Sequence, residues 1–185
     1  MRSLLFSLYT TSWLSWFAAQ MLGPIYAIFV QDIGGDILDV GIAWAIFTIS
    51  MGILMIIFGK LEDTSFDKRN AVVFGFLLIT MGTAGYLLIE TPIHLFTVQA
   101  ILGLGAAMAY PAWDALFMKS VSKKKESTAW AIQEGGIQIV AGIAAVAGSF
   151  IAMYYGFTVL FVSMMALQMA ALLLSLHLFL PFKKT

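Results

Sequence analysis

The sequence predicts an all-α membrane protein with six transmembrane helices, and three observations lead to this fold class. Of the 185 residues, 61% are hydrophobic and 11% are charged, whereas a soluble domain carries about 25% charged residues. A chain of this length cannot bury so much apolar surface in one core. The apolar residues also form continuous runs near or above the ~20 residues with which a helix crosses the hydrocarbon layer. The runs lack an alternation of period two, which favours helices over a barrel.

The first predicted helix covers Leu4–Val30. This run is longer than the ~7–15-residue core of a signal peptide and lacks a small-residue cleavage site, so we expect a retained helix. The other five helices are predicted over Val40–Phe58, Ala71–Ile89, Ile93–Met118, Ala129–Tyr154 and Phe157–Leu180. Short connections with breaker or polar residues separate them, at Gly34–Asp36, Thr64–Ser65, Thr91–Pro92, Lys123–Lys125 and Gly156. We expect residues 1–185 to form a single transmembrane domain.

The basic residues predict the orientation of these helices. All ten Lys and Arg residues fall on the same side: Arg2, Lys60, Lys68, Arg69, Lys119, Lys123, Lys124, Lys125, Lys183 and Lys184. The loops on the other side carry only acids: Asp32, Asp36, Asp39 and Glu90. Because cytoplasmic loops carry an excess of Lys and Arg, we expect an integral plasma-membrane protein with both termini in the cytoplasm.

The composition argues against an enzyme. The chain has no cysteine, and His94 and His177 lie far apart, so neither a thiolate site nor a histidine metal cluster is expected. The sequence contains no nucleotide-binding loop, nucleophile elbow or metalloprotease signature. The formal net charge of zero gives no general attraction to nucleic acid. We therefore predict no catalytic residues, no cofactor, no metal and no nucleic-acid partner.

Two motifs resemble those of a known transporter family. From Gly59 to Arg69 the sequence reads GKLEDTSFDKR, which resembles the loop motif of the major facilitator superfamily: Gly, three residues, Asp, a basic residue, then Gly and a basic pair. Gly59, Asp63 and Lys68 match this motif, whereas Thr64, Phe66 and Asp67 depart from it. Residues 99–107 read QAILGLGAA, which is similar to the family's Arg-x-x-x-Gly-x-Gly-Ala-Ala with glutamine in place of arginine.

The resemblance covers one six-helix half of such a transporter. In the family, two halves are related by a pseudo-twofold axis along the membrane normal, and the substrate site lies between them. Both halves lie the same way up, so the resemblance implies that two copies of this chain can pair as a parallel homodimer. It also implies a gating role for Gly59, Asp63 and Lys68. A relative without transport activity and a piece of a longer protein remain alternatives.

Two acids inside predicted membrane helices, Asp114 and Glu134, are the candidates for proton or cation coupling. A charge at the centre of a membrane helix costs at least ~2.5–3.5 kcal/mol. Glu134 lies about 10 Å into its helix at 1.5 Å per residue, and Gln138 shares its face. Glu134 either faces a wet cavity or pairs near the interface with a lysine such as Lys124. Asp114 lies about one turn before Lys119, so a local pair is an alternative for it too.

Two polar or aromatic helix faces are candidates for the substrate cavity. The predicted fourth helix carries a stripe of Gln99, Gly103, Ala106, Tyr110 and Asp114. It either lines a pathway or packs against another helix, and we favour the pathway because Gln99 and Asp114 gain little from lipid. The predicted first helix carries Tyr9, Trp13, Trp16, Gln20 and Pro24 on one face. Aromatic residues near a membrane surface often only anchor the helix, which accounts for Tyr9.

The resemblance implies that the first and fourth helices line the cavity of each half. The candidate lining residues are Trp13, Trp16, Gln20, Gln99, Tyr110 and Gln138. A mostly aromatic cavity with one or two carboxylates would suit an amphipathic or cationic organic solute.

Small residues form stripes on two further helices and allow close approach of helix backbones in lipid. They are Gly41, Ala45, Thr48 and Gly52 on the second helix, and Ala141, Ala145 and Ser149 on the fifth. The spacing fits packing within one chain or between two, and the resemblance favours packing between protomers.

These observations predict a secondary active transporter of a small organic solute, working as a homodimer of half-transporters and coupled to protons through Glu134 or Asp114. The bilayer, a second copy of the chain and the solute are its expected partners. The alternative is a membrane subunit or scaffold that docks another integral protein without transporting.

Overall fold

The computed structural model describes residues 2–64 and 67–176, which form helices and no strand. The α-helices are α1 (Arg2–Gln20), α2 (Tyr26–Asp32), α3 (Ile37–Thr64), α4 (Lys68–Gly85), α5 (Pro92–Ser120) and α6 (Glu126–Ser175). Three single-turn 3₁₀ helices join them: η1 (Gly23–Ile25), η2 (Tyr86–Leu88) and η3 (Lys123–Lys125). Five stretches are long and apolar enough to cross a membrane: Leu4–Asp32, Ile37–Glu62, Lys68–Leu88, Pro92–Ser120 and Lys123–Ser175. The predicted all-helical class is confirmed.

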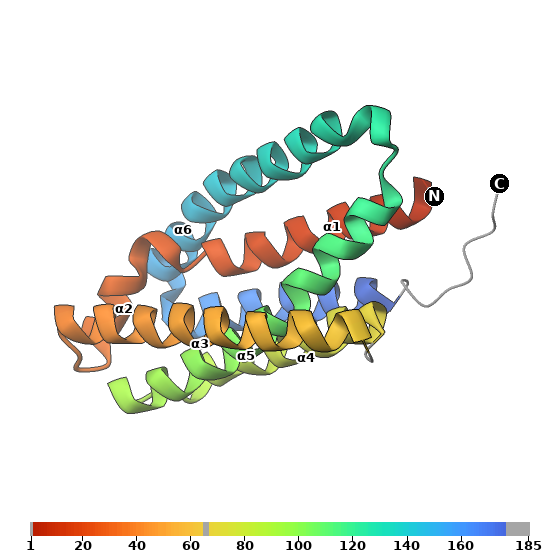
Figure 1. The fold of residues 1–185 in the computed structure, drawn as a ribbon. Coiled ribbons are helices and arrows are strands. Elements are labelled where there is room, and N and C mark those ends of the chain that lie inside the picture. The colour runs from red at the N-terminus through yellow and green to blue at the C-terminus, as the bar shows by residue number, and fades with distance from the viewer. Residues whose placement is uncertain (1, 65–66, 177–185) are drawn as a thin grey trace.

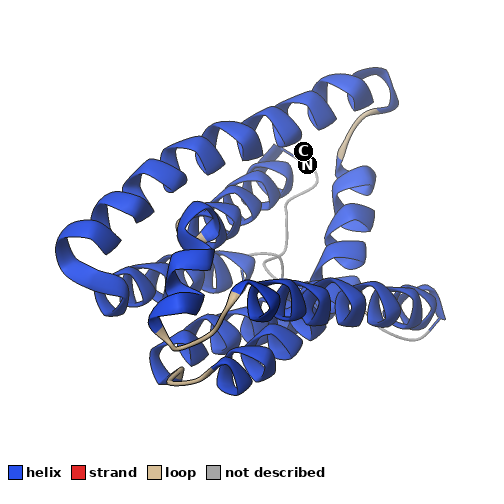
Figure 2. Cartoon of the chain, turned by 90° about the vertical axis from the view of Figure 1, so that its left-hand side faces the viewer, coloured by secondary structure: helices blue, strands red, loops and turns tan. Residues whose placement is uncertain are grey.

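The fifth stretch contains two helical arms. Gly156 has a φ of +83°, a conformation that glycine adopts readily because it has no β-carbon, and it interrupts α6. The chain folds back there, so that the two arms of α6 run in opposite directions (Figures 1 and 2). Gly156 lies where the sequence predicted a connection between two helices. The predicted end of the last helix, residues 177–180, lies outside the described residues.

The first membrane stretch is broken, whereas the sequence predicted one continuous helix over Leu4–Val30. α1 ends at Gln20, and α2 begins at Tyr26 after the 3₁₀ turn. Pro24 has no backbone N–H and cannot donate to the carbonyl of Gln20 four residues earlier, and Gly23 adds flexibility. These two residues account for the break, although the run stays apolar throughout.

The helices pack as pairs whose backbones approach closely. α3 and α4 both pack on α5, and α1 packs along α6 (Figure 1). Gly75 of α4 meets the backbone of α5, where a β-carbon would lie 2.7 Å from the Ala109 nitrogen and from the Gly105 carbonyl oxygen. Gly103 meets α3 in the same way at Phe47. Small residues thus let these membrane helices gain dispersion contacts that larger side chains would prevent.

The described Lys and Arg residues all lie at one end of the bundle, whereas the charged residues of the opposite end are acids. Helix ends at one end, here called the basic end, carry Arg2, Lys60, Lys68, Arg69, Lys119 and Lys123–Lys125. The opposite end, here called the acidic end, carries Asp32, Asp36, Asp39 and Glu90. Asp36 caps α3 by accepting from the backbone N–H of Leu38 at 2.7 Å, and Asp67 caps α4 by accepting from that of Arg69 at 2.7 Å. Lys183 and Lys184 lie outside the described residues.

Two apolar clusters hold the ends of the bundle. One is centred on Phe29, Tyr86 and Phe161 toward the acidic end. The other is centred on Phe76, Trp113 and Phe117 toward the basic end. Polar residues of α1 lie between the two clusters, and they line the site described next.

Candidate functional site

Two adjoining cavities open between the helices. The first, here called the carboxylate cavity, measures about 260 Å³ and contains both candidate acids in its lining. The second, here called the aromatic cavity, measures about 540 Å³. Four residues line both cavities and form the waist between them: Ser15, Trp16, Gln20 and Tyr110. Three of these four were predicted as cavity residues.

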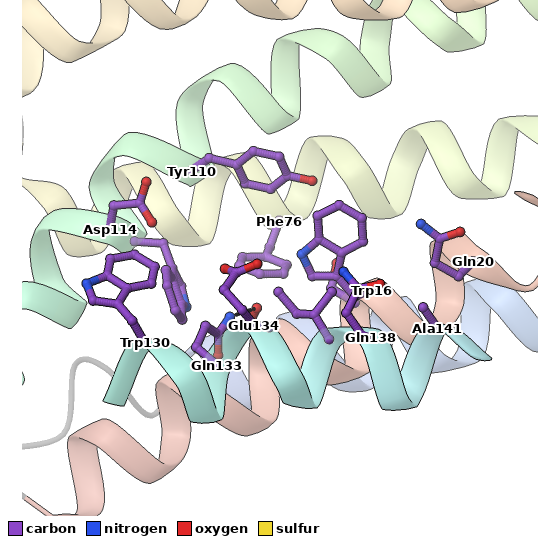
Figure 3. Close-up of a pocket in the computed structure, with 14 residues that line it drawn as sticks. Trp16, Gln20, Phe76, Tyr110, Asp114, Trp130, Gln133, Glu134, Gln138 and Ala141 are labelled. Carbon is purple, nitrogen blue, oxygen red and sulfur yellow. Dashed lines mark hydrogen bonds between the residues drawn. The ribbon is translucent and has the colours of Figure 1, made fainter. Parts of the chain in front are cut away.

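The carboxylate cavity lies between α1, α5 and α6, with Phe76 of α4 behind it (Figure 3). Asp114 and Tyr110 enter from α5, and Glu134 and Gln138 enter from α6. Asp114 and Glu134 are both exposed, and their negative charges act on each other across the cavity. Two carboxylates in a cavity of a membrane bundle attract a cation and can exchange a proton with water. Glu134 and Gln138 share one face of α6, as their spacing predicted.

The aromatic cavity carries no charged side chain in its lining. Aromatic rings contribute much of its wall, from Trp16, Tyr26, Trp44, Phe47 and Tyr86 among others. Gln99 projects into it from α5 and is only 5% exposed. Its side-chain N–H₂ donates to the hydroxyl of Tyr26 at 2.6 Å and to that of Tyr86 at 3.2 Å. The cavity therefore offers apolar surface with one concentrated group of neutral polar atoms.

Two buried glutamines bind the serines of α1 beside the cavities. Gln133 donates through its amide nitrogen to the Ser12 hydroxyl at 2.7 Å, and the Ser15 hydroxyl donates to the Gln168 carbonyl oxygen at 3.0 Å. These glutamines are 2% and 1% exposed. The second polar atom of each, Gln133 Oε1 and Gln168 Nε2, has no hydrogen-bond partner. The α1–α6 contact thus holds two costly unpaired polar atoms.

The α5 stripe divides between the two roles that the sequence left open. Gln99, Ala106 and Tyr110 line the aromatic cavity, and Asp114 lines the carboxylate cavity. Gly103 instead packs against α3.

The α1 face divides as well. Trp16, Gln20 and Pro24 line cavities, but Trp13 lies outside both linings. Its indole N–H donates to the carbonyl of Gln133 at 3.2 Å, and a β-carbon on Gly136 would overlap its ring. The predicted cavity residue Trp13 is thus placed in the α1–α6 contact, as is Tyr9, whose hydroxyl donates to the Ala129 carbonyl at 3.0 Å.

The predicted small-residue stripes differ in exposure. On α3, Gly41 and Gly52 are exposed with open space where a β-carbon would stand, and Ala45 and Thr48 are half-buried. On α6, Ala145 and Ser149 are half-buried, whereas Ala141 lines the carboxylate cavity.

The loop-motif residues lie at the basic end. Gly59 is half-buried with open space beside it. The Lys68 ammonium donates to the Glu62 carbonyl at 3.0 Å. The side chain of Asp63 lies outside the described residues.

Sequence reasoning missed several lining residues. Ser12, Ser15, Gln133 and Gln168 are polar residues inside apolar runs, which is itself a signal of function or of helix packing. Tyr26, Trp44, Tyr86 and Trp130 carried no comparable signal, because aromatic residues are common throughout this chain.

Comparisons with known proteins place these features in context. The sequence profile of the Major Facilitator Superfamily matches residues 8–184. The chain is 29% identical over 167 residues to the multi-drug resistance efflux pump PmrA of Streptococcus pneumoniae serotype 4, an alignment that covers 85% of this chain and 40% of the pump. It is 30% identical over 97 residues to YitZ of Bacillus subtilis, described as an uncharacterised transporter of the same superfamily, which covers 50% of this chain and 56% of YitZ. The chain thus spans less than two thirds of the length of these relatives.

Solved transporters share the fold. The chain superimposes on the POT family transporter PepTSo with a TM-score of 0.82 at 15% identity, covering all of this chain and 40% of that one. It superimposes on a peptide transporter POT in complex with sulfate with a TM-score of 0.80 at 22% identity, covering 94% and 37%. At such low identity the likeness concerns the fold alone.

Proposed function

We propose, because this chain belongs to the major facilitator superfamily, that it is a six-helix half of a secondary active transporter for a small amphipathic or cationic organic solute. Protons drive the transport through Glu134 or Asp114. The basic end faces the cytoplasm of the cell, because cytoplasmic loops carry the excess of Lys and Arg. The superfamily consists of membrane transporters, and the efflux pump among the relatives supports a solute of this class.

The observation that carries this proposal is the carboxylate cavity. Asp114 and Glu134 are exposed on the side of the bundle where α5 and α6 diverge. A lone carboxylate facing lipid would cost several kcal/mol, so these two require water, a cation or a second protein unit opposite them. Trp16, Tyr110 and Trp130 line the same cavity as the two carboxylates. The faces of these aromatic rings attract organic cations.

A second copy of the chain supplies the opposite wall of the cavity. Only 6% of the most apolar stretch of α3 is buried. A β-carbon added at Gly41 or Gly52 of this helix would meet no other part of the chain within 4 Å. Gly142 on the first arm of α6 is open in the same way. Open glycines on α3, which lines the aromatic cavity, and on α6, which lines the carboxylate cavity, support close packing of a partner there. A parallel homodimer joined through α3 and the first arm of α6, including Ala45, Thr48, Ala145 and Ser149, encloses both cavities.

The basic end acts as the gate. We place Asp63, with Gly59 and Lys68, near the beginning of the partner's α6 around Ser127 and Thr128. A helix begins with unpaired backbone N–H groups and about half a positive charge, so a carboxylate is stabilised there. The contribution is about 0.3–1 kcal/mol when exposed, enough to bias a gate without locking it.

Uptake by proteoliposomes tests the transport function. The purified chain is reconstituted, a pH gradient is imposed, and accumulation of ethidium, a fluorescent aromatic cation, is followed. We expect uptake that exceeds that of protein-free liposomes and collapses with a protonophore. Uptake equal to that of protein-free liposomes in both gradient directions would favour the alternative, a membrane subunit that docks another protein through its exposed α3 face.

A further inference from the structure

The hydrogen bonds of Gln99 fix the direction in which two tyrosine hydroxyls can donate. The Gln99 amide nitrogen donates to the hydroxyl oxygens of Tyr26 and Tyr86. A hydroxyl has one proton to donate and accepts through its lone pairs. Each hydroxyl therefore accepts from the amide and keeps its own proton for another partner. Within residues 2–64 and 67–176, no protein atom accepts a hydrogen bond from either hydroxyl.

Both donors belong to the aromatic cavity and are held in place. Tyr26, Tyr86 and Gln99 all line it, and its lining contains no charged side chain. The Tyr86 ring packs against Phe161 with the ring centroids 5.1 Å apart, and against Phe29 at 5.9 Å. Tyr26 begins α2 directly after the break. Two oriented O–H donors thus stand in a neutral, largely apolar cavity.

We propose that Tyr26 and Tyr86 form a subsite for an uncharged oxygen acceptor, such as a carbonyl or ether oxygen, of the transported solute. Gln99 is the positioning residue, because its donation makes both hydroxyls donors. A carboxylate is a poor occupant, since no cation in the lining offsets its desolvation. This inference rests on the proposed function and narrows its substrate class.

The substrate class follows from the spacing of the two subsites. Gln99 and Asp114 lie fifteen residues apart on α5, which is about 22 Å at 1.5 Å per residue. The solute is an elongated amphipathic cation whose neutral acceptor lies far from its charge. The cationic group occupies the carboxylate cavity, and the acceptor reaches through the waist at Trp16 and Tyr110.

Two matched probes test this subsite. Both carry a trimethylammonium group on an alkyl chain long enough to span the subsites. One chain ends in a phenyl ketone, and the other has a methylene group in place of the ketone carbonyl. Dissociation constants are measured by calorimetry for the full chain in lipid nanodiscs. We expect Tyr26→Phe and Tyr86→Phe each to weaken binding of the ketone about fivefold, as for the loss of one neutral hydrogen bond, and to leave the methylene probe unchanged.

The positioning role of Gln99 has its own variant and control. In Gln99→Leu no amide donates to the two hydroxyls, so neither hydroxyl is held as a donor into the cavity, and the preference for the ketone over the methylene probe falls. Thr83→Val is the matched control. Thr83 lines the same cavity, but its hydroxyl already donates to the Ile79 carbonyl at 2.8 Å, so this variant keeps the preference.

Three outcomes would overturn the inference. Equal weakening of both probes by the tyrosine variants would mean that the hydroxyls act only through packing. Tighter binding of a probe that ends in a carboxylate than of the ketone probe would contradict a subsite for a neutral acceptor. Absence of binding by both probes to the wild-type chain would contradict the proposed function as well. A methylene probe that binds the wild type and is lost in Glu134→Gln keeps the proposed function, whatever the tyrosine variants do.

Discussion

Gly148 of α6 lies directly against the backbone of Met21, at the break between α1 and α2. A β-carbon on Gly148 would overlap the Met21 carbonyl oxygen and would lie 2.6 Å from its Cα. Both Met21 and Gly148 are buried. The neighbour of α6 at this point is backbone rather than a flexible side chain, so the contact has little room to relax.

This contact predicts a contrast between two glycine substitutions on α6. Gly148→Ala should destabilise the protein by about 1–3 kcal/mol, as overpacking does in a filled core. In the dissociated monomer, Gly142→Ala should be neutral or stabilising by up to ~1 kcal/mol, because the added methyl group meets open space within the chain and alanine favours helix. Thermal unfolding in dilute detergent measures both. Equal melting temperatures for the two variants would contradict the close α6–Met21 contact.

The Ser12–Gln133 pair predicts a non-additive pair of substitutions. Ser12→Ala removes the acceptor for the Gln133 amide at 2.7 Å and leaves a buried donor unpaired, at a cost of about 1–3 kcal/mol. The double variant Ser12→Ala with Gln133→Leu removes both partners and the already unpaired Gln133 Oε1. We expect the double variant to be more stable than the single one. A double variant that melts lower than Ser12→Ala would show that this amide is needed for packing.

Much of this fold follows from residues that are visible in the sequence. The apolar runs place the helices, and Gly156 lies at the predicted reversal of α6. The break before Tyr26 is less visible, because Pro24 sits within an uninterrupted apolar run and its effect depends on local hydrogen bonding.

The candidate site was predictable only in part. The spacing of Glu134 and Gln138 placed both on one face, and they do line one cavity. The position of Trp13 depends on Gly136, which leaves room for its indole on the α6 surface. Helical spacing gives the face of a residue but not the neighbour that this face meets, and so it could not separate Trp13 from Trp16.

The proposed homodimer predicts cysteine crosslinks between protomers. The chain has no cysteine of its own, so Gly52→Cys on α3 and Ala145→Cys on α6 report single positions. We expect both variants to form disulfide-linked dimers in native membranes. Met81→Cys on α4 is the control, because its side chain is 58% exposed on a helix outside the proposed interface. Crosslinking that is efficient at Met81 and absent at Gly52 would exclude this arrangement.

The proposed gate predicts a change of conformation in Asp63→Asn. Loss of the negative charge weakens the attraction to the partner's helix N-terminus by about 0.3–1 kcal/mol. The population should shift toward a state open at the basic end, with little change in melting temperature. Spin labels at Lys60 and Ser127 give the distance distribution across the dimer. A distribution that is identical in wild type and variant would leave Asp63 as a local residue of its loop.

The central claim is that the carboxylate cavity couples protons to cation transport, and one measurement tests it most directly. The initial rate of ethidium uptake driven by a pH gradient is measured in proteoliposomes for Glu134→Gln, Asp114→Asn and Glu90→Gln. Glu90 is exposed at the acidic end, outside both cavities, and is the matched control. Glutamine and asparagine keep the shape of the acids but cannot titrate. We expect Glu134→Gln or Asp114→Asn to lower the rate roughly tenfold or more, which corresponds to about 1.4 kcal/mol of activation free energy, while Glu90→Gln transports as the wild type does. Wild-type uptake rates in both cavity variants would contradict the account.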